Sequence, residues 1–468
     1  MTERNVVAEI RASCLEPLQA AVLGEGPIVY EKATEDAFET YEHWVPSLPL
    51  DATLDEVDAL WMDSAQLLLQ TTKSNRSMLP CIAAPVFKLI RIVSRLDDML
   101  WTQPPKQQSS PKWAPLLLFA ISHYMVEDVP WASHDTNADA CNVLEHISRH
   151  VALRSGGPAP TPEELASTYF SRILSLCGAK VDKDTWVKIG CPAPYALRHV
   201  MCQVRFPNLT ADTVGRCLAF ALPLLDQTTV ATQRLGLAML HHVVKEATPT
   251  DIRWHGDVVL HMLAETLKIA MGDPAFLGAT LRCLSDTLRV VSVAHDVTEY
   301  NRVFPSLLRS WDLTSDVALK RVYVVELRPW VVAMGAPHSL QIVQYLPAIL
   351  TVLIGCMENA LLAADAIATL RLVVLHAWVR MGHHVEDVVI ALLRCLVFGS
   401  IQSRQPAADT ATAEPPLLAE CCDVMTLLQP LSKQSIPAMV GNLGDRCTEL
   451  HPICTAVCAV LAVESELK

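Results

Sequence analysis

Two sets of histidine and cysteine residues have the chemistry of metal ligands. The first is the pair His241 and His242, in the apolar stretch QRLGLAMLHHVVKEATPTDI. Neighbouring residues of a helix point about 100° apart, so a shared metal would need a third ligand between them. Val243 and Val244 follow the pair, so no HExxH motif is present. We therefore expect one histidine to face the core and bond a carbonyl group, and the other to lie at the surface.

The second set lies near the C-terminus, in DRCTELHPICTAVCAV. Cys447, His451, Cys454 and Cys458 superficially resemble a zinc site. On one continuous helix they would span about 16 Å at about 1.5 Å per residue, which is too far for four ligands to converge. Pro452 predicts the start of the last helix, with Cys454 and Cys458 one turn apart on its apolar face. We expect neither a metal nor a cofactor.

Motifs for phosphate binding and for nucleophilic catalysis are missing from the sequence. The segment GEGPIV (Gly24–Val29) is not a GxGxxG fingerprint, and neither a GxxxxGK[ST] loop nor a GxSxG turn occurs. The acidic pairs Asp97–Asp98 and Glu163–Glu164 are interpreted as exposed charges at helix ends. The sequence thus predicts a protein that is not an enzyme, with a metal- or thiol-dependent enzyme as an alternative.

The elements that would position these residues are helices. Hydrophobic residues make up 51% of the 468 positions, while the chain holds only 17 glycines and 6% aromatic residues. Leu, Ala and Val run in long stretches between polar turns, which favours packed helices over a glycine-rich β-sandwich or propeller. The composition predicts an all-α protein.

Charge and hydropathy limit the possible partners. Residues 1–60 contribute −10 of the net charge of −13, so no basic surface suited to nucleic acid is expected.

Mean hydropathy is +0.28. The longest charge-free span, Pro329–Met357, is interrupted by Pro and polar residues, and its cleanest part is shorter than a membrane span of about 20 residues. We interpret it as a helix buried on most sides by its neighbours. With an N-terminus that lacks an apolar signal segment, the protein is expected to be soluble and intracellular.

Cysteines are frequent but scattered. The 15 cysteines form no framework spacing. Cys217, Cys283, Cys356 and Cys395 lie singly on apolar helical faces, and the pair Cys421–Cys422 is expected in the core. We interpret them as reduced thiols that act as small hydrophobic residues.

Breaks in the pattern divide the chain into regions. Loops are expected at Trp101–Lys112, Arg154–Pro162 and Ile401–Pro416, where Pro, Gly, Gln and Ser gather. They delimit an acidic N-terminal helical region (1–100) and a helical region between loops (113–190). Residues 192–468 follow as HEAT-like helical repeats with a flexible loop at 401–416.

Within the third region, amphipathic helices alternate with short turns. Helix pairs that begin near Thr229, Asp273, Thr314 and Ala360 have offsets of 44, 41 and 46 residues, within the period of HEAT or armadillo repeats. N-caps are expected at Thr250, Asp273, Thr314 and Ser315. The predicted fold class is therefore an all-α, HEAT/armadillo-like α-solenoid of paired antiparallel helices, with a generic helical bundle as the alternative. Long surfaces of such arrays usually bind other large proteins.

Aromatic and arginine side chains of the C-terminal repeats are the candidates for partner binding, because interface hot spots favour Trp, Tyr and Arg. The candidates are Arg321, Tyr323, Trp378 and Arg380, with Trp330 nearby in the sequence. Filling of gaps between repeats and capping of neighbouring carbonyl groups are the alternative roles for these side chains.

The double-histidine stretch resembles the signature region of the Tel-Two-interacting protein two family. The matching positions are Leu235, Gly236, Leu240, His241, His242, Val243, Val244, Pro249 and Asp251. Further similarity runs through about residues 195–400, including RFPNL upstream and TLRLVVLHAWVRM downstream. The family motif has no catalytic meaning, which implies structural roles for these residues.

The resemblance implies a non-enzymatic scaffold, or adaptor, of the TTT complex. Its partners would be Tel-Two-like and Tel-Two-interacting protein one-like subunits, and indirectly the chaperone machinery that matures phosphatidylinositol-3-kinase-related kinases of the TOR, ATM and ATR class. DNA-damage signalling, telomere maintenance and growth control would depend on it. Neither nucleic acid nor membrane is an expected partner, and the expected location is the cytoplasm, with the nucleus as a second location. A HEAT-repeat transport adaptor of the importin type is the rival interpretation.

Overall fold

The computed structural model describes residues 5–23, 32–42, 53–72, 79–100, 110–127, 129–188, 190–293, 296–403 and 417–466. Its ordered elements are helices, and the described residues contain no β-strand. Contacts divide the chain into two compact units, Met1–Asp251 and Ile252–Lys468. The predicted limits near residues 100, 113, 190 and 192 remain predictions.

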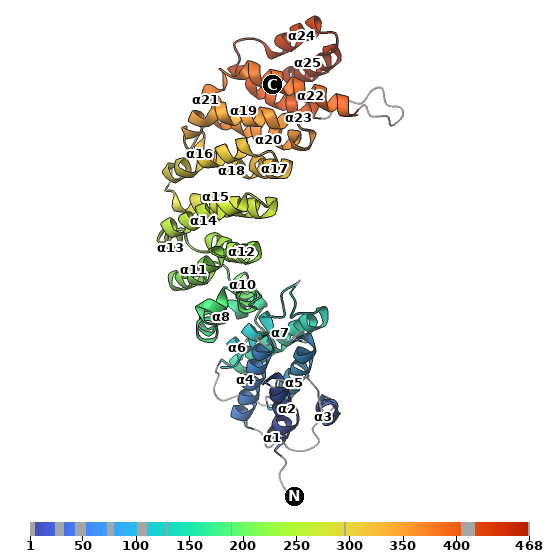
Figure 1. Ribbon diagram of the computed structural model, residues 1–468, viewed down its shortest axis with the longest axis vertical. Helices are drawn as coiled ribbons and strands as arrows, with labels where there is room; N and C mark the ends of the chain where they lie inside the picture. Colours follow the sequence, from blue (N-terminus) through green and yellow to red (C-terminus); the bar gives the residue numbers. More distant parts are fainter. Residues whose placement is uncertain are drawn as a thin grey trace. The chain divides into compact units, whose positions relative to one another are not determined.

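Unit 1 is built from helices that pack against their neighbours in the sequence (Figure 1). Its α-helices are α1 (Val6–Ile10), α2 (Glu16–Leu23), α3 (Lys32–Glu42), α4 (Leu54–Thr71), α5 (Leu79–Leu100), α6 (Ala114–Ser122), α7 (His134–Ser155), α8 (Pro162–Lys180), α9 (Lys183–Trp186), α10 (Ala193–Met201), α11 (Ala211–Leu225) and α12 (Val230–Glu246). A π-helical turn, η1 (Arg11–Leu15), joins α1 to α2, and α13 (Pro249–Arg253) spans the boundary with unit 2.

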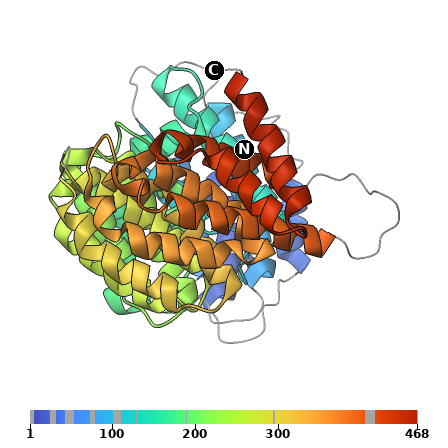
Figure 2. The ribbon, with the colours of Figure 1, turned by 90° about the horizontal axis from the view of Figure 1, so that it is seen from above.

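Unit 2 consists of two layers of helices, which are stacked with similar directions in the view from above (Figure 2). The helices α15, α17, α20 and α23 pack in succession in one layer, and α16, α19 and α22 form the other. Its helices are α14 (Gly256–Ala270), α15 (Pro274–Val291), α16 (Thr298–Leu313), α17 (Val317–Glu326), α18 (Arg328–Met334), α19 (Leu346–Met357), α20 (Ala360–His376), α21 (Trp378–Met381), α22 (Val385–Ser403), α23 (Leu418–Leu428), α24 (Ile436–Arg446) and α25 (His451–Glu466), with 3-10 turns η2 (Gln341–Tyr345) and η3 (Gln429–Leu431).

The predicted all-α repeat class is confirmed. The helices α12, α15, α17 and α20 begin at Val230, Pro274, Val317 and Ala360, at offsets of 44, 43 and 43 residues. Contacts between repeats follow the same period, since the Thr369 hydroxyl donates to the Val324 carbonyl oxygen 45 residues earlier (2.8 Å). Each repeat leaves an apolar face that only the next repeat covers.

Several local predictions need correction. Asp273 caps α15 as expected, but α17 is capped by Asp316 rather than by Thr314 or Ser315. Thr250 lies inside α13, where Thr248 accepts the capping hydrogen bond.

The predicted loops also differ from the structure. Helix α7 continues through Arg154 and Ser155 to a left-handed Gly156, so the second loop begins two residues later than predicted. Residues 101–109 and 404–416 of the other two predicted loops, like the segment Gly24–Val29, lie outside the described residues, and α22 extends to Ser403.

Among the described residues, no helix combines the length and the apolar character needed to cross a membrane. The cysteines that were expected in the core, Cys217, Cys283, Cys356, Cys395 and the pair Cys421–Cys422, are all buried.

Candidate partner-binding surface

The signature region has a structural role in unit 1. Gly236 lies where α12 crosses α11, and a Cβ atom there would come within 2.8 Å of the Ala221 carbonyl oxygen and of Leu224 Cβ. Only glycine allows the two helices to approach this closely. Leu235 and Leu240 on the same helix are buried.

One of the two histidines ties α12 to the segment that follows α10 (Ala193–Met201). His242 is half-buried, and its Nε2 donates to the carbonyl oxygen of Val204 (2.8 Å), while His241 is half-buried beside it. The prediction that one histidine bonds a carbonyl is confirmed for His242. Pro249 and Asp251 begin the short helix α13, and Asp251 accepts a hydrogen bond from the Thr248 hydroxyl (2.7 Å).

The C-terminal cysteines Cys454 and Cys458, which only superficially resemble part of a zinc site in the sequence, contribute to packing within a helix pair. Cys454 lies on α25 over Gly444 of α24, and a Cβ at Gly444 would be 2.9 Å from Cys454 Cβ. The Cys458 thiol donates to the carbonyl oxygen of Pro437 (3.5 Å). Within the described ranges, His, Cys, Asp and Glu side chains form no group of three suited to a metal ion.

The four partner-binding candidates differ in accessibility. Tyr323 is 1% exposed, and burial raises the pKa of its phenol. Its ring is therefore part of the core of unit 2 and cannot touch a partner directly, because α17 turns this side chain inward. Trp330 is likewise fully buried, with its ring 5.4 Å from that of Tyr300.

The remaining three candidates reach solvent. Arg321 is 65% exposed and donates through Nε to Asp365 of α20 (2.8 Å). Trp378 is 52% exposed and shares the short helix α21 with the exposed Arg380. Both α17 and α21 contact α20, so the structure places these residues within two adjacent repeats. Partner binding by them remains a prediction.

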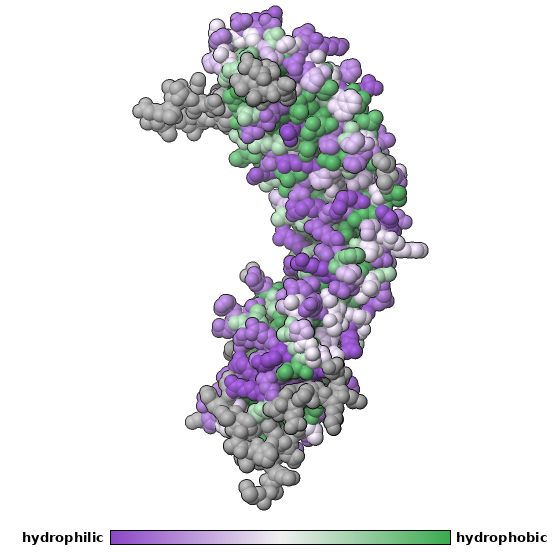
Figure 3. Space-filling model, turned by 180° about the vertical axis from the view of Figure 1, so that it is seen from behind, coloured by the Kyte–Doolittle hydropathy of each residue, from purple (hydrophilic) through white to green (hydrophobic). Residues whose placement is uncertain are grey.

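A groove between α19 and α22 was not expected from the sequence. It encloses about 470 Å³, and its apolar lining comes from Leu350, Ile354, Ile390 and Ala391. Thr351, Asp387 and Arg394 supply polar groups, and Pro347 with His384 marks the N-terminal ends of the two helices. Hydrophobic residues also reach the surface in the C-terminal part of unit 2 on the face shown in Figure 3.

The charge-free span Pro329–Met357 is the feature of the sequence that pointed to the region of this groove. Helix α19 lies in that span and contains no charged residue, but it is not buried all round, because Pro347, Ala348, Thr351 and Gly355 are exposed. The interpretation of a helix buried on most sides is confirmed, because seven of the twelve residues of α19 are buried, but one face of the helix is exposed.

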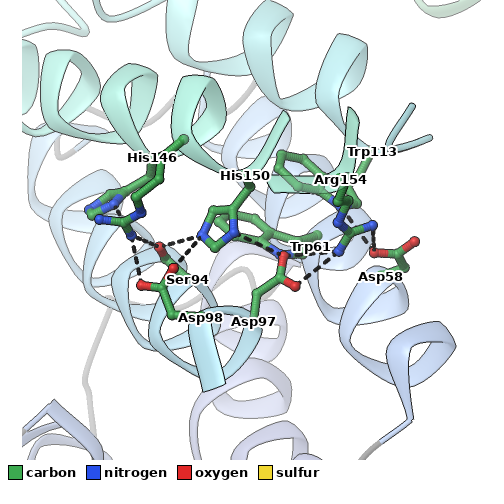
Figure 4. Close-up of polar contacts among 10 residues, drawn as sticks. Asp58, Trp61, Ser94, Asp97, Asp98, Trp113, His146, His150 and Arg154 are labelled. Carbon is green, nitrogen blue, oxygen red and sulfur yellow. Dashed lines mark hydrogen bonds and ion pairs between the residues drawn. The ribbon is translucent and has the colours of Figure 1, made fainter. Parts of the chain in front are cut away.

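A buried charge network lies in unit 1 (Figure 4). Arg154 of α7 pairs with Asp97 of α5 (Nη2 to Oδ2, 2.9 Å) and with Asp58 of α4 (Nη1 to Oδ1, 2.6 Å). Trp61 donates through Nε1 to Asp97 (2.9 Å), and Trp113 donates to Asp58 (3.1 Å). The two indole rings stack with centroids 4.4 Å apart.

The prediction of an exposed Asp97 is therefore wrong. Its side chain is 0% exposed and Arg154 is 3% exposed, because α7 covers this face of α5. Asp98, next in the sequence, is 37% exposed and pairs with Arg149 (2.8 Å), so the acidic pair is split between core and surface. This network joins residues 58–98 to residues 113–154 inside one compact unit.

Burial sets the protonation of the network. Loss of solvent lowers the pKa of His150 to about 3, so the ring is neutral at pH 7, with Nε2 3.0 Å from the Ser94 hydroxyl oxygen. Burial raises the pKa of Asp58 and of Asp98 and outweighs the opposing effects of Arg154 and Arg149. Buried pairs of this kind specify how helices pack and do not by themselves indicate chemistry.

Comparisons with known proteins give relatives in two rodents. TELO2-interacting protein 2 of Mus musculus is 24% identical over 355 residues, which are 72% of this chain and 66% of the relative. TELO2-interacting protein 2 of Rattus norvegicus is 24% identical over 353 residues, with the same shares. The aligned part thus spans just under two thirds of the length of these relatives. No protein-family model matches the chain.

Structures of Kap121p are among the solved structures that align with this chain. A Kap121p mutant is 13% identical, with a TM-score of 0.48 over 90% of this chain and 37% of that chain. Kap121p bound to Pho4p is 12% identical, with a TM-score of 0.39 over 97% of this chain and 50% of that chain.

Proposed function

We propose that this chain, a relative of TELO2-interacting protein 2, is a non-enzymatic scaffold that holds other large proteins together. The resemblance read from its sequence is confirmed by the two rodent relatives, and it extends beyond the double-histidine motif to 72% of the chain. The observation that carries the proposal is this relationship, together with a repeat fold whose signature residues serve packing. Gly236 lets α12 lie close against α11, and His242 bonds the carbonyl group of Val204, so both residues serve packing.

The name of the relatives supports binding to a Tel-Two-like subunit, and the finer function is the one that the resemblance of the double-histidine region implies. The chain would bind a Tel-Two-like subunit and a Tel-Two-interacting protein one-like subunit in a TTT complex. As a co-chaperone it would support the maturation and stability of phosphatidylinositol-3-kinase-related kinases, and hence DNA-damage signalling, telomere maintenance and growth control. It would work in the cytoplasm, with the nucleus as a second location.

The docking surface for the larger subunit would lie in the C-terminal repeats. Arg321, Trp378 and Arg380 are the exposed members of the predicted hot spot. Trp378 is a suitable anchor, because a half-exposed indole buries a large apolar area on binding. Tyr323 would contribute only by supporting α17 from inside.

Affinity purification of the tagged full-length chain tests this function. Mass spectrometry of the co-eluting chains should find the two partner subunits and a giant kinase of the class named above. Trp378→Ala should lower recovery of the larger subunit about tenfold, the effect of about 1.4 kcal/mol. Trp254→Ala is the matched control, because Trp254 is 83% exposed on unit 2 outside the predicted hot spot.

Two outcomes would count against the proposal. Recovery of transport cargo in place of the partner subunits would favour the importin-type alternative. Full recovery of the larger subunit with Trp378→Ala and Arg380→Ala would remove the hot spot and leave the scaffold role.

A further inference from the structure

We propose that the groove between α19 and α22 binds one amphipathic α-helix of another protein chain. The inference deepens the proposed function, on which it rests, because it names a second docking element on the C-terminal repeats and the kind of segment that fits it. The helix would lie along the groove and place its apolar stripe on Pro347, Ile354 and Ile390, which are exposed or half-buried.

The dimensions of the groove suit a short helix. The lining residues recur at Pro347, Leu350 and Ile354 on α19, and from His384 to Arg394 on α22. At about 1.5 Å per residue these stretches are about 10 Å and about 15 Å long, which is two to three helical turns. A helix docked in such a groove presents apolar residues at positions i, i+3 or i+4, and i+7.

The uncharged face of α19 is a second observation. A helix face in water usually carries charged side chains, as α14 does with Asp257, Glu265 and Lys268. The exposed positions of α19 are Pro347, Ala348, Thr351 and Gly355, none of which is charged. Together with Ile390, which is 45% exposed on α22, they form an uncharged strip, part of it apolar, that a protein partner would remove from water.

The charges beside the groove define the register of the occupant. Asp387 and Arg394 both lie on the exposed side of α22, seven residues or about 10 Å apart. Neither forms an ion pair with another side chain in the described part of the chain. The bound helix therefore carries a basic residue opposite Asp387 and an acidic residue about seven positions away, opposite Arg394.

A photo-crosslink identifies the occupant directly. In the full-length chain, p-benzoylphenylalanine takes the place of Thr351, which is exposed at the edge of the groove. Crosslinking in cells, followed by mass spectrometry of the joined peptides, should give a segment of another chain with an apolar stripe at helical spacing and opposite charges about seven positions apart. A crosslink to a second copy of this chain, a segment without that pattern, or no crosslink to protein would overturn the proposal.

Variants of the groove test the same contact quantitatively. Ile390→Glu and Arg394→Glu should each lower recovery of the crosslinked chain at least tenfold. Ile269→Glu is the matched control, because Ile269 is an isoleucine 53% exposed on α14, outside the groove. Circular dichroism of each variant checks that the helices are intact. Exchange of the acidic residue of the occupant for lysine should restore binding to Arg394→Glu.

The results separate this inference from the proposed function. If no segment with the expected pattern crosslinks, or if Ile390→Glu and Arg394→Glu leave the crosslink undiminished, while the TTT-type subunits still co-purify, the groove proposal fails and the scaffold role stands. If a helix with the expected pattern crosslinks but the TTT-type subunits do not co-purify with the chain, the groove proposal stands and the proposed function fails.

Discussion

Replacement of Arg154 by methionine tests whether the charge network holds unit 1 together. Methionine keeps most of the apolar length of the side chain and removes the guanidinium group, which pairs with Asp97 and Asp58. Asp97 would remain 0% exposed with the indole N–H of Trp61 as a hydrogen-bond donor. Loss of one partner from a buried ion pair costs about 3–5 kcal/mol, so we expect Arg154→Met to lower the free energy of opening of unit 1 by that amount.

The matched control is Arg149→Met on the same helix. Arg149 also pairs with an aspartate at 2.8 Å, but its side chain is 48% exposed and Asp98 is 37% exposed. Water screens this pair, so the control should cost less than about 1 kcal/mol. The contrast between the two arginines isolates the effect of burial.

Hydrogen-exchange mass spectrometry in a urea series is the assay. Peptides from α4, α5 and α7 report the free energy of local opening in unit 1. This quantity can differ between the two units of the chain, so it is measured in unit 1 itself. The double variant Arg154→Met/Asp97→Asn removes both fully buried charges and should recover part of the loss, because the only carboxylate left without its arginine is Asp58, which is 27% exposed and keeps the indole N–H of Trp113 as a donor. If Arg154→Met costs no more than Arg149→Met, or if the double variant is as unstable as the sum of its parts, the network does not stabilise this packing.

Three further changes test other parts of the structure. Gly236→Ala should lower the free energy of unfolding by about 1–3 kcal/mol through overpacking against α11. The control is Gly441→Ala, at a helical glycine with open space around it, which should raise the free energy of unfolding by up to about 1 kcal/mol. Equal effects of the two substitutions would contradict the close approach of α12 to α11. The His150 ring stays neutral in the folded protein because its pKa is lowered to about 3, whereas in the unfolded chain it gains a proton below about pH 6.5. Protonation therefore favours the unfolded chain as the pH falls. The free energy of unfolding is unaffected by His150 above about pH 6.5 and falls by about 1.4 kcal/mol for each pH unit below it. His150→Gln should therefore reduce the loss of stability between pH 7 and pH 5 by about 1–2 kcal/mol in urea titrations, and an unchanged pH profile would argue against it. Arg321→Met should cost only about 1 kcal/mol, because Arg321 is 65% exposed and Asp365 keeps its second pair with Arg328 (3.1 Å). A loss above about 3 kcal/mol would show that the contact between Arg321 and Asp365 acts as a buried pair.

The helices and their period could be predicted because their signals are local. Apolar residues recur at helical spacing, and capping side chains such as Asp273 bond the backbone only two and three residues away. The period of 43–44 residues follows from pairs of such helices of nearly constant length. The role of Gly236 could be expected only through the resemblance, because a glycine inside a helix gives no local reason for its presence.

The accessible sites could not be predicted from the same signals. Arg321 and Tyr323 are two positions apart, and a helical pattern places them on different faces without deciding which face a neighbour covers. The uncharged span around α19 marked an apolar helix in the sequence, but whether its outer face meets solvent depended on where α22 packs.

The sequence by itself determined the all-α class, the repeat length, the similarity to TELO2-interacting protein 2 and the helical positions of the signature residues. Only the tertiary structure decided that Asp97 and Arg154 are buried partners, that Tyr323 belongs to the core, and that α19 and α22 enclose a groove. The physical reason is distance along the chain. Arg154 reaches Asp97 across 57 residues, and burial at either position is set by a helix that local propensity and periodicity do not place.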